Sequence, residues 1–535
     1  MNRTETIQNL KTKAFDLLVI GGGITGVGIA LDAQLRGVKT ALVEMQDFSE
    51  GTSSRSTKLV HGGLRYLKQF DVGLVMEVGR ERAIVHHLAP HLVHPDKMLL
   101  PLIQDGNYGK ILTNVGLMIY DWLANVEPAD QRVMLNKEEA QQQEPLLRQD
   151  VLEGAGFYAE YRTDDSRLVM AVAKVANQKG AQLANYLEVL DFIYNEIGKV
   201  SGVEVKDHIT GEKFSIHAKV VVNATGPWVD SLRKKDHSLK GKKLHLTKGV
   251  HIVVPFDKLP LSQTVYFDNQ DGRMLFAIPR NNILYLGTTD TNYAGDIANP
   301  RAKKQDVEYI LNAINNMFPS ANLTIKDVLS SWAGLRPLIH EEGKDPSELS
   351  RKDEIFHSKT GLISIAGGKL TGYRKMAEKV VDEVVDKMDF KTSKCTTEKE
   401  ILDGNSFKNH QEVEDYVNYL QSTYPEIIKK HRQAKYLVYN YGINSEKILG
   451  IKSKNPNLSN IEAELVYTIE EEMVQTALDF FERRTGRMNF DIQSVKENTE
   501  KVIQFLAKKF HWSPNKIAEE AKKLNQVIIS KTTFE

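Results

Sequence analysis

The chain has 535 residues, of which 41% are hydrophobic and 26% charged, a composition typical of a soluble globular protein with about three domains. Lysine plus arginine and aspartate plus glutamate both number 70, so the formal net charge is zero and no bulk attraction to nucleic acid is expected. The single cysteine, Cys395, excludes an intrachain disulfide framework and a cysteine-rich metal site, which fits a reducing cytoplasm.

The first residues, 1–13, are polar and lack the apolar core of a signal peptide. The longest uncharged apolar run lies between Asp16 and Asp32, and it is short and rich in glycine, which suits a turn better than a bilayer. We therefore expect a cytoplasmic chain without an integral membrane segment. Peripheral attachment to the inner face of the cytoplasmic membrane stays open.

Residues 15–44 predict a strand, a glycine turn, a helix and a second strand. The strand 15–20 is apolar, the helix 24–36 carries small residues that allow close packing on a sheet, and Gly37 ends it before the strand 38–44. This is one right-handed βαβ unit of the kind that binds nucleotides.

A glycine fingerprint occupies the turn of this unit. Gly21, Gly23 and Gly26 have the spacing that lets backbone N–H groups and a helix N-terminus face a pyrophosphate. Glu44 ends the second strand, where a carboxylate can accept hydrogen bonds from ribose hydroxyls. Alone, the triplet would equally suit a tight turn, but its context predicts a dinucleotide. NAD and FAD share the adenosine half, so the fingerprint does not separate them.

A polar segment, 53–67 (SSRSTKLVHGGLRYL), follows the unit. It combines hydroxyl side chains, a glycine pair and four cations if His61 is counted, which suits a phosphorylated cofactor beside a small anionic substrate.

Later segments predict the rest of the nucleotide-binding sheet and a second, antiparallel one. Strands are expected at 180–189, 200–205, 219–223 and 361–366, the last followed by a helix at about 371–388. Between residues 240 and 330, short alternating runs at 244–254, 263–267, 273–279 and 283–289 predict an antiparallel meander. Residues 391–535 have mostly helical patterns after the polar linker 391–394.

Five motifs in this order (GGGITG, SSRSTKLVHGGLRYL, NATGPWV, WAGLRPL and IAGGKLTGYR), with the C-terminal segment 471–487, carry a resemblance that covers nearly the whole chain. The sequence resembles the FAD-dependent glycerol-3-phosphate dehydrogenases of aerobic glycerol catabolism, within the amino-acid-oxidase-like flavoproteins. The resemblance implies an α/β fold with a discontinuous Rossmann-like FAD-binding domain, an antiparallel-sheet substrate domain and a C-terminal helical domain.

The implied oxidoreductase region is 1–390, and the C-terminal helical domain is 391–535. The FAD-binding parts would be about 1–75, 150–235 and 330–390, and the substrate-domain parts about 76–149 and 236–329. The residues expected to bind FAD are Gly21, Gly22, Gly23, Ile24, Thr25, Gly26, Glu44, Thr52, Ser53, Lys58, His61, Gly62, Gly63, Leu64, Val189, Ala224, Gly226, Gly367, Gly368, Lys369, Leu370 and Thr371.

The turn 367–371 also has a physical argument of its own. It lies between a predicted strand and a predicted helix, so its N–H groups and the helix dipole can face the N1–C2=O edge of the flavin.

Arginine residues suggest how the substrate is held, because a phosphate monoester favours guanidinium donors. Arg65, Arg336 and Arg351 are expected in loops next to motifs. By the resemblance, Arg65, Tyr66 and Arg351 contact the substrate. Arg65, Arg336 and Lys369 together hold its phosphate and polarise the reacting oxygen.

The proton acceptor is predicted to be His251, on a strand, because a neutral imidazole suits the removal of a hydroxyl proton. His61 is an alternative, although it could equally hold the flavin, and an arginine could also be argued. The alternative interpretation of His251 is a hydrogen-bonded core residue without a role in the chemistry.

Four histidines lie close together at His86, His87, His91 and His94. Pro90 breaks their helical spacing and no acid completes a ligand set, so a loop with scattered histidines is favoured over a metal site.

The activity implied by the resemblance is oxidation of sn-glycerol 3-phosphate to dihydroxyacetone phosphate, with FAD as cofactor and a membrane quinone as electron acceptor. A homodimer is kept as a candidate assembly. The nearest alternative is a glycerophosphate oxidase that reduces O2 to peroxide. Such oxidases are typically longer after the Arg-Pro-Leu motif, whereas here only about thirty residues separate 336–338 from 366–368. A flavin-binding scaffold without catalysis and a nicotinamide enzyme are the remaining alternatives.

Overall fold

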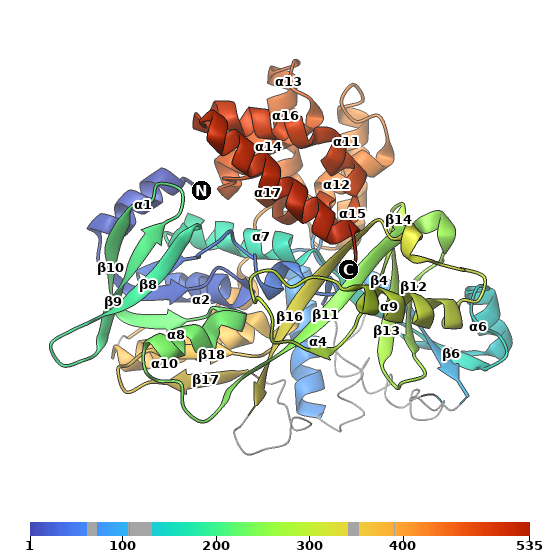
Figure 1. Ribbon diagram of the computed structural model, residues 1–535, viewed down its shortest axis with the longest axis horizontal. Coiled ribbons are helices and arrows are strands. Elements are labelled where there is room, and N and C mark those ends of the chain that lie inside the picture. Colours follow the sequence, from blue (N-terminus) through green and yellow to red (C-terminus); the bar gives the residue numbers. More distant parts are fainter. Residues whose placement is uncertain (61–71, 105, 107–130, 341–352, 390) are drawn as a thin grey trace.

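The computed structural model describes residues 1–60, 72–104, 106, 131–340, 353–389 and 391–535. Two β-sheets lie next to each other, and a group of C-terminal helices packs above them (Figure 1). Among the described residues, no helix combines the length and apolar character needed to cross a membrane.

The first sheet has the strand order β17-β18-β10-β1-β2-β7, and β8 and β9 extend it beside β10. The strands from β18 to β7 run parallel, whereas β17 is antiparallel at the edge. Its strands are β1 (Phe15–Ile20), β2 (Thr40–Val43), β7 (Gln182–Ala184), β8 (Leu187–Tyr194), β9 (Val200–Asp207), β10 (Lys213–Asn223), β17 (Glu354–His357) and β18 (Ile363–Ala366). Three separate stretches of sequence thus build one sheet, so the predicted discontinuous nucleotide-binding fold is confirmed.

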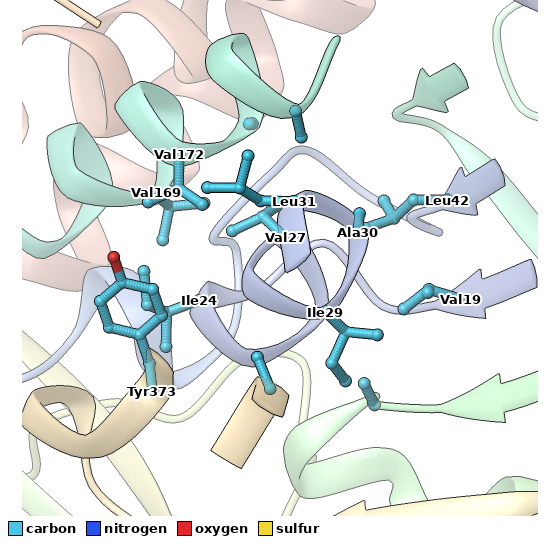
Figure 2. Packing of buried hydrophobic residues seen from close by; sticks show 14 of the residues in the cluster. Val19, Ile24, Val27, Ile29, Ala30, Leu31, Leu42, Val169, Val172 and Tyr373 are labelled. Atoms are coloured by element: carbon cyan, nitrogen blue, oxygen red, sulfur yellow. The ribbon is translucent and has the colours of Figure 1, made fainter. Parts of the chain in front are cut away.

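Helix α2 (Ile24–Leu35) lies at the centre of the main core, between α7 (Asp165–Gln178) and α10 (Tyr373–Lys387) (Figure 2). Val27 and Ile29 are fully buried, and a Cβ added at Gly28 would lie 3.0 Å from the ring of Tyr373. Each such buried aliphatic side chain stabilises the fold by about 1.5–3 kcal/mol. The absence of a side chain at Gly28 thus lets α2 pack closely against the start of α10. Helices α1 (Arg3–Thr12) and α8 (Val229–Lys235) complete this part.

The second sheet has the order β15-β11-β14-β13-β12-β4-β6-β3, with β16 paired to β11 and β5 to β6. Its strands are β3 (Leu59–Val60), β4 (His94–Ile103), β5 (Val133–Asn136), β6 (Leu152–Arg162), β11 (Lys243–Pro255), β12 (Thr264–Asp268), β13 (Met274–Arg280), β14 (Ile283–Gly287), β15 (Thr291–Asn292) and β16 (Ser330–His340). The four strands predicted between 240 and 330 are therefore present. Helix α9 (Lys304–Met317) buries its apolar face against them, and α4 (Val72–Leu88) and α6 (Lys137–Gln143) complete the part that is described.

Three expectations need correction. Residues 152–162 and 330–340, assigned from the sequence to the FAD-binding part, are strands β6 and β16 of the second sheet, because each pairs along its length with a strand of that sheet. Arg336 lies within strand β16 and not in a loop. The histidines at 86 and 87 lie in α4, and β4 starts at residue 94, so these histidines do not share one loop.

The C-terminal residues are helical, as expected, and their apolar faces form cores of their own. The helices are α11 (His410–Thr423), α12 (His431–Tyr441), α13 (Ser445–Lys454), α14 (Asn460–Glu472), α15 (Arg487–Phe490), α16 (Ile492–Phe510) and α17 (Pro514–Thr532), with the π-helical segment η10 (Asp479–Arg484) between α14 and α15. The segment η10 contacts helix α7, and helices α15 and α17 contact strand β16, so this group packs on the helical layer beside the first sheet and on the second sheet.

Candidate functional site

A cavity of about 320 Å³ opens where parallel strands of the first sheet end. The residues directly after β1, β2, β10 and β18 all line it, which is the place where open α/β sheets bind ligands. Among the residues predicted to bind FAD, those that line the cavity are Gly21, Gly23, Ile24, Thr25, Glu44, Thr52, Ser53, Val189, Ala224, Gly226, Gly367, Gly368, Lys369 and Leu370.

The glycine turn leaves no room for side chains. Gly21 has a φ of +112°, and a Cβ there would lie 2.5 Å from the carbonyl oxygen of Ala224. A Cβ at Gly26 would lie 1.9 Å from the carbonyl oxygen of Gly21. The backbone therefore approaches the cavity closely at the N-terminus of α2, where the helix dipole favours a phosphate.

Glu44 fastens this turn to the end of β2. Its carboxylate accepts hydrogen bonds from the backbone N–H groups of Gly22 at 2.7 Å and Gln46 at 2.9 Å. Burial raises the pKa of Glu44 to about 7, against the effect of these two hydrogen bonds. Gly22 itself lies behind the cavity wall, and its N–H is used by Glu44. The carboxylate thus faces the cavity with both oxygens already partly satisfied.

The segment after β2 supplies a second wall through η1 (Thr52–Ser54). The hydroxyl of Ser53 accepts from the N–H of Ile24 at 3.0 Å, and the hydroxyl of Thr52 donates to the carbonyl of Leu335 at 2.7 Å. Lys58 does not line the cavity: its buried ammonium is paired with Asp165 and donates to the carbonyl of Ser54. In this structure Lys58 thus fixes the loop, and its predicted contact with FAD phosphates stays a prediction.

The turn after β18 forms a third wall. Gly367 and Gly368 have φ values of +78° and +77°, which favour glycine, and a Cβ at Gly368 would lie 2.4 Å from the sulfur of Met376. Lys369 and Leu370 line the cavity, and Thr371 is buried in the short turn η7 (Leu370–Gly372) that precedes α10. Contact of this turn with the flavin stays a prediction.

Arg336 and His251 lie on neighbouring strands of the second sheet, and neither side chain lines the cavity. Pro337 lines the cavity, and β16 pairs Arg336 with Thr247 of β11. A Cβ at Gly249 would lie 2.4 Å from Nη2 of Arg336, so the guanidinium lies over Gly249. Residues 249 and 251 project from the same face of β11, because side chains alternate along a strand. The structure therefore brings the predicted arginine and histidine to one face, next to the cavity.

The residues that directly follow β14 hold the side chain of Arg336. Its guanidinium donates to the hydroxyl of Thr288 at 3.1 Å, and to the carbonyl of Thr289 and the carboxylate of Asp290 at 3.2 Å each. Its side chain remains 31% exposed, so one side of this cation is accessible to a solute.

His251 is buried and stacked on Trp332, with ring centroids 4.8 Å apart. Its Nε2 is 3.1 Å from the hydroxyl of Thr57, and its Nδ1 has no hydrogen-bond partner among the described residues. Burial, then the charges of Arg336 and Lys58, lower the pKa of His251 to about 3. The imidazole is therefore neutral at physiological pH.

Seven residues predicted to bind FAD or the substrate lie outside the described residues: His61, Gly62, Gly63, Leu64, Arg65, Tyr66 and Arg351. Their roles stay predictions.

Sequence reasoning missed Thr57, Thr288 and Asp290 as partners of the site. Thr57 lies within the segment 53–67, so its place in that motif could have indicated a role in the site. Thr288 and Asp290 follow β14 without any motif, and they reach Arg336 because β11 pairs with β14 on one side and with β16 on the other.

Buried neutral histidines make this fold sensitive to acid. The pKa values of His91 and His251 are about 3, mainly through burial, compared with 6.5 for an ordinary histidine. Below pH 6.5 the unfolded chain takes up protons that the folded chain does not, so stability falls as the pH drops from 6.5 toward 3. At pH 5 each of these histidines should lower the free energy of unfolding by about 2 kcal/mol relative to neutral pH.

We expect His91→Asn to lose less unfolding free energy between pH 7 and pH 5 than the unmodified chain, in urea denaturation with cofactor concentration fixed. His208→Gln, at an exposed histidine, serves as the control and should change nothing. An equal loss in all three proteins would contradict the low pKa of His91.

Comparisons with known proteins agree with this site. A family model described as FAD dependent oxidoreductase matches residues 16–374, and one described as the C-terminal domain of alpha-glycerophosphate oxidase matches residues 395–517. The chain is 48% identical to the aerobic glycerol-3-phosphate dehydrogenase of Bacillus subtilis (strain 168), with 99% of this chain and 97% of that protein covered.

Two solved structures add to this comparison. The glycerol-3-phosphate dehydrogenase from Bacillus halodurans complexed with FAD matches with a TM-score of 0.85 and 44% identity, covering 99% of this chain and 98% of that chain. The dithionite-reduced L-alpha-glycerophosphate oxidase from Mycoplasma pneumoniae with FAD bound matches with a TM-score of 0.56 and 20% identity, over 72% of this chain and 97% of that chain. The second match shows likeness of fold alone.

Proposed function

This chain belongs to the family of FAD-dependent aerobic glycerol-3-phosphate dehydrogenases, and we propose that it oxidises sn-glycerol 3-phosphate to dihydroxyacetone phosphate. The observation that carries this proposal is that Arg336 and His251 share one face of the second sheet within one residue of the cavity wall: Arg336 precedes Pro337, and His251 contacts Thr57, which follows Ser56. An anion-binding cation and a neutral imidazole next to a flavin site are what oxidation of a phosphorylated secondary alcohol requires.

The cavity has the features that FAD needs. The close backbone at Gly21 and Gly26 and the N-terminus of α2 suit the pyrophosphate, Glu44 suits the ribose, and the turn 367–371 suits the flavin ring. When bound, FAD supplies a hydride acceptor at its N5 atom. The other predicted FAD residues in the cavity wall belong to this proposal.

Arg336 and Lys369 would hold the substrate phosphate and polarise the reacting oxygen. Arg336 is already oriented by Thr288 and Asp290, so little conformational freedom is lost when it binds an anion. Arg65, Tyr66 and Arg351 are proposed to complete the substrate contacts.

His251 would accept the hydrogen bond of the C2 hydroxyl and then its proton. The hydroxyl becomes strongly acidic as the hydride leaves carbon, so even a weakly basic imidazole can take this proton. The Nδ1 atom is buried and has no hydrogen-bond partner among the described residues, and it is the acceptor of the tautomer in which Nε2–H donates to the hydroxyl of Thr57. Trp332 keeps the ring in one plane.

We further propose that electrons leave to a membrane quinone, in glycerol catabolism, with the chain bound peripherally at the inner face of the cytoplasmic membrane. A homodimer remains the candidate assembly, and the division into an oxidoreductase region, 1–390, and a helical domain, 391–535, remains a proposal. The second candidate function is that of a glycerophosphate oxidase, because the model that matches the C-terminal residues is described by such an enzyme.

The test is an anaerobic titration of the FAD-loaded protein with sn-glycerol 3-phosphate, followed at the flavin absorbance near 450 nm. We expect the band to bleach in proportion to added substrate, with glycerol as an ineffective control. An unchanged spectrum would reject the activity. Rapid peroxide formation in air without an added quinone would favour the oxidase instead.

A further inference from the structure

The C-terminal helical region reaches the loop that forms the adenosine side of the cavity. Asp47, three residues after Glu44, is fully buried and accepts two hydrogen bonds from Arg484, at 2.7 and 2.8 Å. It also accepts one from Nε of Arg483 at 2.7 Å. Both arginines belong to η10, a segment 436 and 437 residues away in the sequence. A π-helical turn often marks a functional site, because it carries an extra residue.

Asp47 also connects a second wall of the cavity. Its other partner is the side-chain amide of Asn185, at 2.9 Å, which leads into the segment 186–189. In that segment the N–H of Tyr186 donates to the carbonyl of Gln46, and the N–H of Leu187 to the carbonyl of Glu44, both at 2.7 Å. Leu187, Glu188 and Val189 line the cavity. One buried carboxylate thus joins the two loops that face the adenosine half of the cofactor.

The negative charge of Asp47 is compensated only when the C-terminal helical region is packed against the loop after β2. Burial would raise the pKa of Asp47, but Arg484 and Arg483 hold it down at about 2. Arg483 also contacts Glu50 at 2.6 Å and Asp479 at 2.7 Å, and Arg484 donates to the carbonyl of Glu472 at 2.8 Å. Removing one member leaves an uncompensated buried charge on the others, which is strongly unfavourable.

We propose that Arg484 of the C-terminal helical region is a positioning residue for FAD. Acting through Asp47, it fixes the loop that carries Glu44 and the adjoining segment 185–189, and thereby sets the shape of the adenosine half of the cavity. This inference rests on the proposed FAD site. It gives the C-terminal region a defined role in cofactor binding, beyond packing.

The test compares Arg484→Lys with Arg487→Lys. A lysine keeps the charge at position 484 but loses the two-pronged contact with Asp47. Arg487 is a matched control in the same region, because it pairs with buried Glu464 at 2.7 Å and does not line the cofactor cavity. The affinities for FAD and for ADP, which is the adenosine half of FAD, are measured by fluorescence and calorimetry, and melting temperatures are measured without cofactor.

We expect Arg484→Lys to weaken both FAD and ADP binding by about tenfold or more, and Arg487→Lys to leave both within about twofold. Both variants should lower the melting temperature of the cofactor-free protein, so loss of stability alone does not separate them. Unchanged ADP and FAD affinity in Arg484→Lys, or an equal loss in Arg487→Lys, would overturn the proposal.

If Arg484→Lys does not fold, Asn185→Ala decides the question. It keeps every ion pair of the cluster and removes the two hydrogen bonds of the Asn185 amide, to Asp47 and to the carbonyl of Met473, so ADP affinity should again fall by about tenfold. Unchanged ADP affinity in Asn185→Ala would then overturn the proposal. If the unmodified protein fails to bind FAD, the proposed function fails and not only this inference.

Discussion

Replacing Arg336 with leucine should lower kcat/KM for sn-glycerol 3-phosphate by about 10²–10⁴, because a charged contact to the substrate phosphate is worth roughly 3–5 kcal/mol in a partly buried site. The guanidinium is oriented by Thr288, Thr289 and Asp290, and it is the described arginine that lies next to both His251 and the cavity wall. Steady-state kinetics with an artificial electron acceptor measures the effect, and FAD content should be unchanged.

Two further variants separate phosphate recognition from general damage. Arg336→Lys keeps the charge but loses the two-pronged geometry, so it should recover only part of the activity. Arg273→Leu removes an exposed arginine that pairs with Asp271 on the neighbouring β12–β13 turn, and it should leave kcat/KM unchanged. Glycerol, which lacks the phosphate, should be a poor substrate for the unmodified enzyme and should lose little more in Arg336→Leu. A comparable loss on glycerol would show that Arg336 does not act on the phosphate.

Replacing His251 with asparagine should lower kcat by about 10²–10⁴ with a small change in KM, the range usual for loss of a proton acceptor. The ring lies against Trp332 and bonds to Thr57, so asparagine removes the acceptor and most of the stacking surface. The rate of flavin bleaching in a single turnover measures the chemical step directly. Thr57→Val is the companion variant and should give a smaller loss, because the imidazole remains but loses its orienting hydrogen bond.

The pH profile tests the state of His251 separately. Because its pKa is about 3, His251 remains neutral down to about pH 4, and kcat should show no acid limb near 6.5 that depends on this residue. An acid limb near 6.5 in the unmodified enzyme that disappears in His251→Asn would contradict the depressed pKa. A kcat that is unchanged in His251→Asn would remove this histidine from the reaction.

The local parts of the site were predictable because their backbone geometry depends on residues that are adjacent in the sequence. A strand, a glycine turn and a helix follow one another at 15–36, and the geometry of Gly21 and Gly26 depends on neighbours only a few residues away. The turn 367–371 follows the same logic. The antiparallel strands between 240 and 330 were also predictable, since alternation of apolar and polar residues is a local property.

Arg336 illustrates where such reasoning failed. Gly334 and Pro337 on either side favour a loop, since glycine and proline weaken most strands. The structure instead pairs β16 with β11 from Lys243 and His340 to Val253 and Ser330, and this long antiparallel pairing outweighs the local preference. The partner of Arg336 in this pairing is Thr247, about ninety residues earlier, and such a distant partner strand cannot be identified from single-residue preferences.

The sequence by itself determined the dinucleotide turn, the class of cofactor that the motifs imply and the helical character of the C-terminal region. Only the tertiary structure decided that Thr57, His251 and Arg336 share one environment, and that Arg484 is buried against Asp47. The physical reason is that backbone geometry responds to neighbouring residues, whereas buried ion pairs and depressed pKa values arise only when distant segments exclude water together.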